Sequence, residues 1–238
     1  MQIAAQNFRG QDGGLRSPGL PAAAVDGMGK IYVVWPDCSF RAGCSTDDIV
    51  VSTSTDGVTW TAISRIPIDP INSTVDHFIP GLGIAPATSG KTAHMALIYY
   101  YYPVASCNNS CQLEVGYTIS TNGGQTWTAG KHLAGPMQLS WLPQSQNGLM
   151  VADYLAVGYS NGKPFGVFAV AHAPSSLLNE AMYTTKSPLQ ISANDPVFNS
   201  RGEKPLPNVK GNYVWKYYDE ESRNPIPSSQ QIPPPNQK

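Results

Sequence analysis

Short apolar runs bounded by turn residues recur along most of the chain. Three of them directly follow a Gly-Lys turn, at residues 31–35, 93–99 and 164–170. Each run is rich in β-branched and aromatic residues, as in a buried strand. Three further runs show the near-alternation of a half-buried antiparallel strand, at residues 48–52, 112–117 and 180–184. The pattern predicts an all-β chain without long amphipathic helices.

A short polar segment that ends in tryptophan occurs twice. Its key positions are Ser54, Asp56, Gly57 and Trp60 in the first copy and Ser120, Asn122, Gly124 and Trp127 in the second. An Asp or Asn side chain there accepts hydrogen bonds from nearby backbone N–H groups, and Gly supplies the positive φ of a tight turn. The Trp ring is then available for burial between sheets. The segment therefore predicts a turn between the third and fourth strands of a sheet, and two copies in register disfavour a chance turn.

The second copy matches the motif Ser-x-Asp-x-Gly-x-Thr-Trp at Ser120, Asn122, Gly124, Thr126 and Trp127. Over about residues 16–190 the chain resembles the sialidase-like Asp-box (BNR-repeat) β-propellers. The first copy is shorter than the motif, and the second has Asn in place of Asp. The resemblance implies a partial β-propeller of four-stranded antiparallel blades, with about two and a half to three blades in this chain. The family motif lies on the blade periphery, so it implies little about chemistry.

Three regions are expected along the chain. Residues 1–190 would hold the blades, residues 191–223 an irregular extension, and residues 224–238 a disordered tail rich in Pro, Gln and Ser. Closed propellers generally have about four to eight blades, so this chain is expected to remain open. Apolar faces at 31–35 and 165–170 would then be exposed, and the chain would belong to a longer propeller or self-associate through its end blades.

All four cysteines fall between the second and third strands of a blade. Cys38 and Cys44 lie in the first such loop, and Cys107 and Cys111 lie in the second, at a matched offset from the tryptophan of each repeat. Pairing within each loop is favoured over a shared zinc site, because equivalent loops on adjacent blades lie apart. Disulfides indicate an oxidising compartment, so an extracellular or periplasmic location is expected. The first residues lack the features of a signal peptide.

Charge and hydropathy exclude several classes of partner. The formal net charge is −1, only 13% of residues are charged, and no cluster of Lys or Arg is present, so no nucleic-acid partner is expected. The longest apolar run is far shorter than the roughly 20 residues that cross a bilayer, so no membrane span is expected. No cofactor or metal is predicted.

Candidate binding residues lie where the first strand of each blade begins, because ligands of propellers usually meet that end of the central channel. These candidates for the channel mouth are Arg16, Asp76, His77, Asp153 and Tyr154. Trp35 and Asp37 lie at the end of the second strand, and Arg41 lies in the loop after it. They could offer an aromatic platform and a guanidinium to an anionic sugar. The alternative is that these side chains only cap turns or contact solvent.

The resemblance leaves two functions open. A catalytic sialidase needs three arginines, a Tyr nucleophile backed by Glu, and an Asp acid/base, with the first arginine in an Arg-Ile-Pro motif. Arg65-Ile66-Pro67 has these letters but follows a repeat copy, and Glu114 and Glu180 fall on third strands. Because the catalytic set is not recognisable, the first hypothesis is an exported module that binds glycans or cell-surface proteins. The second is part of an exo-acting glycoside hydrolase of the sialidase type, whose other blades lie outside this chain.

Overall fold

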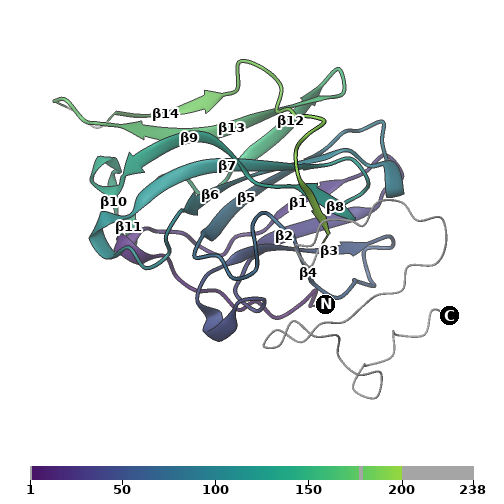
Figure 1. The fold of residues 1–238 in the computed structure, drawn as a ribbon, viewed down its shortest axis with the longest axis horizontal. Helices are drawn as coiled ribbons and strands as arrows, with labels where there is room; N and C mark the ends of the chain where they lie inside the picture. Colours follow the sequence, from purple (N-terminus) through teal and green to yellow (C-terminus); the bar gives the residue numbers. More distant parts are fainter. Residues whose placement is uncertain (1, 177–178, 200–238) are drawn as a thin grey trace. The chain divides into compact units, whose positions relative to one another are not determined.

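The structure is a computed structural model that describes residues 2–176 and 179–199 (Figure 1). Within this part of the chain every regular element is a β-strand or a single turn of 3-10 helix, so the predicted all-β class is confirmed. No helix in these ranges is long and apolar enough to cross a membrane. The expectations for the tail at 224–238, and for most of the extension before it, lie outside the described residues.

Two four-stranded antiparallel sheets follow the order of the chain. The first sheet comprises β1 (Ala22–Val25), β2 (Ile31–Asp37), β3 (Asp48–Ser54) and β4 (Ser64–Arg65). The second comprises β5 (Asp76–Ile84), β6 (Met95–Tyr102), β7 (Gln112–Ser120) and β9 (Lys131–Gln138). The apolar runs predicted as second strands are therefore found in β2 and β6.

A third sheet has three strands, β12 (Ala156–Ser160), β13 (Lys163–His172) and β14 (Asn179–Thr184). Its first strand begins after Asp153 and Tyr154, which had been predicted to lie at the start of that strand. Among the described residues no fourth strand pairs with β14, so this sheet ends in a free edge.

Short elements connect the sheets. The strands are β8 (Thr126–Thr128), which pairs with β15 (Val197–Asn199), and β10 (Gln144–Ser145), which pairs with β11 (Gly148–Leu149). The 3-10 turns are η1 (Asp12–Gly14), η2 (Ala42–Cys44), η3 (Gly90–Thr92), η4 (Asn108–Ser110) and η5 (Leu139–Trp141). Strand β15 is an addition to the prediction, since it falls in the segment that was expected to be irregular.

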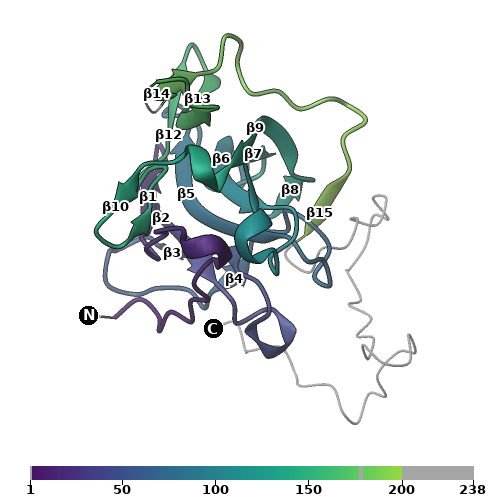
Figure 2. The ribbon, with the colours of Figure 1, turned by 90° about the vertical axis from the view of Figure 1, so that its left-hand side faces the viewer.

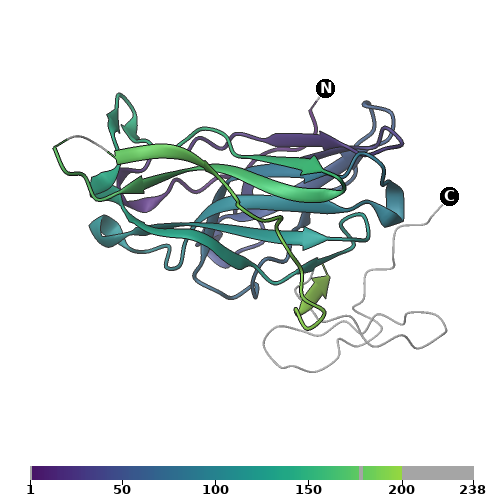
Figure 3. The ribbon, with the colours of Figure 1, turned by 90° about the horizontal axis from the view of Figure 1, so that it is seen from above.

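The first strands of the three sheets lie together, with β5 in contact with both β1 and β12 (Figures 2 and 3). Gly81 of β5 packs on Leu155 and Gly83 packs on Val157, so β5 and β12 run in the same direction. A Cβ atom at Gly81 would lie only 2.5 Å from the carbonyl oxygen of Leu155. Glycine is thus required for this close approach of two sheets, which places the starts of β5 and β12 at the same end.

The outer face of the first sheet is covered. Val33, Trp35 and Val50 are buried on this face under a group of residues outside the strands and at the sheet margin: Ile3, Ala4, Ile31, Phe40, Trp60 and Ile63. Phe168 and Val170 of the third sheet are likewise buried, in a core shared with the second sheet. The prediction of exposed apolar patches at 31–35 and 165–170 is therefore wrong. Residues 31–35 are covered in part by N-terminal residues, and most of 165–170 is covered by neighbouring strands.

The first repeat copy forms the predicted turn after β3. The Asp56 carboxylate accepts hydrogen bonds from the N–H groups of Val58 and Thr59, at 2.8 and 2.6 Å, and these donors hold the pKa of Asp56 well below its usual range. Ser54 Oγ accepts from the N–H of Gly57, whose φ is 72°. The side chains thus replace backbone partners that a tight turn leaves unpaired.

The second copy repeats these contacts between β7 and β8. Asn122 Oδ1 accepts a hydrogen bond from the N–H of Thr126 at 2.9 Å, and Ser120 Oγ accepts from the N–H of Gly124 at 2.9 Å. Trp127 is buried and donates from Nε1 to the Gly124 carbonyl. Both copies are therefore turns that are stabilised by their own Ser and Asp or Asn side chains.

Both predicted disulfides are present. Cys38 is bonded to Cys44 and Cys107 to Cys111, each with a Cα–Cα distance of 4.8 Å. No free cysteine remains in the chain. Each bridge closes the loop between the second and third strands of its sheet.

Candidate functional site

Residues 7–17, which we name the N-terminal segment, cross the ends of the sheets where the first strands begin. The Cys38 N–H donates to the Asn7 carbonyl at 2.8 Å, which ties the segment to the first sheet. Asp12 accepts from the Cys107 N–H at 3.1 Å, in the second sheet's disulfide loop. The N–H of Arg16 then donates to a carbonyl of β11 at 2.7 Å. One short segment therefore contacts three separate parts of the fold.

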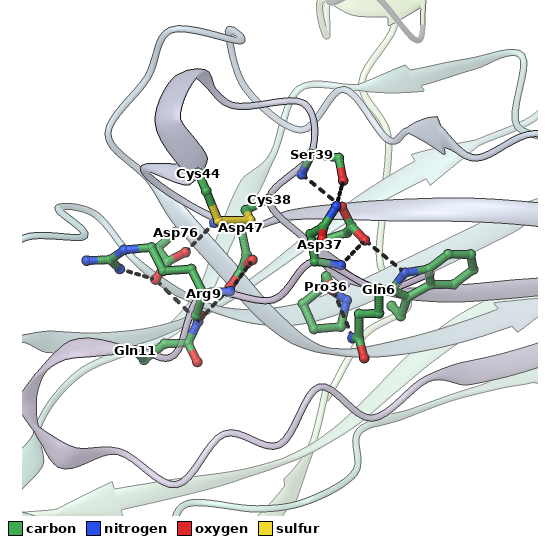
Figure 4. The surroundings of a disulfide bond; sticks show 12 residues. Gln6, Arg9, Gln11, Pro36, Asp37, Cys38, Ser39, Cys44, Asp47 and Asp76 are labelled. Atoms are coloured by element: carbon green, nitrogen blue, oxygen red, sulfur yellow. Dashed lines mark hydrogen bonds and ion pairs between the residues drawn. A yellow bond between two sulfur atoms is a disulfide. The ribbon is translucent and has the colours of Figure 1, made fainter. Parts of the chain in front are cut away.

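Two buried carboxyl groups hold the middle of this segment (Figure 4). Asp47 accepts from the Arg9 N–H and from Gln11 Nε2, both at 3.1 Å, and its own N–H donates to Asp76 at 2.6 Å. Gln11 Nε2 also donates to Asp76 at 3.3 Å, and Arg9 lies 3.5 Å from the same carboxylate. Burial raises the pKa of Asp47 to about 8 and that of Asp76 to about 6.

Asp76 was predicted to face a channel mouth, but its side chain is fully buried beneath the N-terminal segment. It therefore anchors the chain and offers no surface to a ligand. Asp47, Arg9 and Gln11 had not been predicted from the sequence. The available signal was the pair of adjacent acids Asp47 and Asp48, which begins three residues after Cys44.

A second buried cluster joins two arginines to two aspartates. Arg41 binds Asp48 through two parallel contacts of 2.7 and 2.6 Å, and Arg65 lies 2.8 Å from the same carboxylate. Both guanidinium groups also contact Asp69, at 2.8 and 2.5 Å. His77 is buried beside them, and burial lowers its pKa. The formal charges of the arginines and aspartates cancel, as a buried ionic cluster requires.

The cluster corrects the interpretation of Arg41, which was expected to present its guanidinium to an anionic sugar. Arg41 is only 4% exposed, because its guanidinium forms ion pairs with Asp48 and Asp69 inside the protein. A metal ion does not fit here either. Ligand atoms of Asp48, Asp69 and His77 lie within 4.8 Å of one another, but the arginines already occupy both carboxylates.

Trp35 and Asp37 are also unavailable as a sugar platform. Trp35 is 6% exposed, and its Nε1 points to Asp37 at 3.4 Å. Asp37 is fully buried and accepts hydrogen bonds from the N–H groups of Asn7 and Ser39, at 3.0 and 2.8 Å. The N-terminal residues cover this end of β2, so both side chains have a structural role.

Arg16, Asp153 and Tyr154 form a partly exposed group, which we name the Arg16 patch. Arg16 Nη1 lies 2.7 Å from Asp153 Oδ1, and Nη2 donates to Oδ2 at 3.1 Å. The two side chains are 26% and 25% exposed, and Tyr154 is 67% exposed. A bridge between Leu15 and Leu149 aligns the N-terminal segment with β11 and so sets the position of Arg16. Of the predicted site residues, Arg16 and Asp153 therefore meet in a partly exposed pair, and the exposed Tyr154 follows Asp153 in the chain.

Among solved structures, the chain is similar to the NanB sialidase of Streptococcus pneumoniae, which was crystallised with 2-[(3-chlorobenzyl)ammonio]ethanesulfonate. The match has 10% sequence identity and a TM-score of 0.39, and it covers 79% of this chain and 47% of the sialidase chain. The chain thus spans about half the length of that protein. A likeness this distant carries no argument about function. No protein-family profile and no curated protein sequence matches the chain.

Proposed function

We propose that the chain is an exported module whose three sheets are consecutive blades of a β-propeller, and that its Arg16 patch binds carbohydrate. The observation that carries the proposal is the partly exposed Arg16–Asp153 ion pair, followed in the chain by Tyr154, which is 67% exposed. Two disulfides and the shared direction of β5 and β12 support the exported, propeller-like setting.

The patch has the groups that a sugar requires. An exposed tyrosine ring can stack on the apolar face of a pyranose, and a carboxylate and a guanidinium can accept from and donate to its hydroxyl groups. Arg16 also favours a sugar that carries a carboxylate, because its guanidinium has more N–H donors than the Asp153 carboxylate accepts. Hydrolysis is less favoured than binding, since glycosidases generally use a pair of carboxyl groups and Asp153 is the one carboxylate in the patch.

Calorimetric titration of the whole chain with 3′-sialyllactose and with lactose tests the proposal. We expect the sialylated sugar to bind more tightly, and Tyr154→Ala to weaken binding about three- to tenfold through lost ring contact. Asp195→Asn is a matched control, because Asp195 belongs to a separate, partly exposed ion pair with Lys131. Binding that Tyr154→Ala leaves unchanged, or no binding of either sugar, would contradict a carbohydrate site here.

A further inference from the structure

A groove of about 670 Å³ lies between strand β9 of the second sheet and strands β13 and β14 of the third. Phe168, Val170 and Leu189 form a buried apolar floor, and Leu133 adds a half-buried wall. The volume falls within the roughly 300–1,000 Å³ typical of small-molecule sites.

Residues 185–190 border the groove and are fixed by backbone hydrogen bonds. The N–H of Thr185 donates to the Gly166 carbonyl at 3.2 Å, and the N–H of Leu189 donates to the Pro164 carbonyl at 2.8 Å. Tyr117 donates its hydroxyl hydrogen to the Gln190 carbonyl at 3.1 Å. The groove is therefore formed before a ligand arrives, which reduces the entropy that binding must overcome.

The groove has few charged groups in its lining, and none of those that the structure describes is negative. Lys186 lines it without a carboxylate partner in the described part of the chain, and the lining contains no Asp or Glu. The hydroxyl oxygen of Thr185 is buried and has no hydrogen-bond partner among the residues described. His172 Nε2 and Tyr183 Oη are 2.9 Å apart at the rim. A lysine with no carboxylate in the described lining favours an anion over a cation.

We propose that this groove binds a small aromatic acid, with its flat apolar body on the Phe168 and Val170 floor and its acidic group beside Lys186. The apolar floor disfavours a fully hydroxylated sugar, which would lose hydrogen bonds to water there. This site is separate from the Arg16 patch and does not depend on it.

A fluorescence titration with 8-anilinonaphthalene-1-sulfonate on the folded 238-residue chain tests the proposal. We expect saturable binding at one site. Lys186→Gln should weaken it about two- to fivefold, the effect of one exposed charge pair. Lys163→Gln is the matched control, because Lys163 is an exposed lysine at the start of β13 and does not line the groove.

A neutral probe separates charge from apolar contact. N-phenyl-1-naphthylamine has the same aromatic body without the sulfonate, so Lys186→Gln should leave its binding unchanged. Tyr183→Ala should weaken both probes, because it removes aromatic surface from the rim. The proposal is overturned if the sulfonate does not saturate, or if Lys186→Gln and Lys163→Gln have equal effects.

Discussion

Replacing Asp47 by Asn should make the protein less sensitive to alkaline pH. The carboxyl group is fully buried, and it faces the acids Asp37 and Asp76 together with Arg9, whose guanidinium reaches Asp76. Ionisation of Asp47 adds a negative charge to a space that holds two other acids and one arginine. Burial accordingly raises the pKa of Asp47 to about 8, and an amide of the same shape would remain neutral at every pH.

The sign and size of the effect follow from proton linkage. The pKa of an aspartate in the unfolded chain is about 3.9, so the folded protein holds this proton more tightly. The associated stability is fully present below about pH 3.9 and is lost as the pH rises through the folded-state pKa of about 8. At about 1.4 kcal/mol for each pKa unit, the upper bound for the whole shift is about 6 kcal/mol. Relaxation and water entry reduce this penalty, so we expect about 2–3 kcal/mol between pH 5 and pH 8.5.

Urea unfolding at about pH 5 and about pH 8.5, followed by tryptophan fluorescence, measures the effect. The natural chain should be less stable at the higher pH, and Asp47→Asn should remove most of that difference while raising stability at pH 8.5. Asp76, whose pKa burial raises to about 6, contributes with the same sign and accounts for the remainder. Asp195→Asn serves as the control, since Asp195 pairs with Lys131 outside this buried group, and the variant should keep the pH dependence. A variant at Asp47 that is equally or more sensitive to alkaline pH would refute the reasoning.

Three further predictions concern substitutions at single sites of the fold. Tyr100 is buried and its hydroxyl bonds both the carbonyl and the N–H of Ala169, at 2.9 and 3.1 Å, so Tyr100→Phe should cost about 2 kcal/mol in urea unfolding. Replacing Cys107 and Cys111 together by Ser should cost about 2 kcal/mol, the loop-closure entropy of so short a loop, and equal stability of the reduced and oxidised protein would contradict this. Met182 is 62% exposed on the free edge strand β14, so if the chain self-associates there, Met182→Lys should return it to a monomer in light scattering.

Local signals in the sequence predicted much of the fold. The Gly-Lys turns and the two repeat copies specify conformations within a few residues, so β2, β6, β13 and both turns could be placed from the chain alone. Strand β15 could not, because its partner β8 lies far away in the sequence and its own run is only three residues long.

Burial of polar side chains was the main failure of the sequence analysis. Arg41 looked like a solvated loop residue because three of its contacts, Asp69, Ile71 and Ser73, come from a later loop that only the tertiary fold brings near. Asp76 was expected at an open end of its sheet. The N-terminal segment that covers it precedes the first repeat and carries no motif, so nothing in the sequence indicated its path.

The N-terminal segment connects the buried acids Asp47 and Asp76 to the Arg16 patch. Arg9 and Gln11 are held by the buried pair Asp47 and Asp76, and Arg16, only a few residues further on, forms the ion pair of the Arg16 patch. An ionised Asp47 weakens the anchoring region by charge repulsion, whereas the hydrogen bond of Arg16 to β11 is independent of pH. The position of Arg16 therefore depends first on β11 and only second on the acid pair. Loss of the anchors should loosen residues 7–12 before it alters the patch, because the patch keeps its own backbone contact.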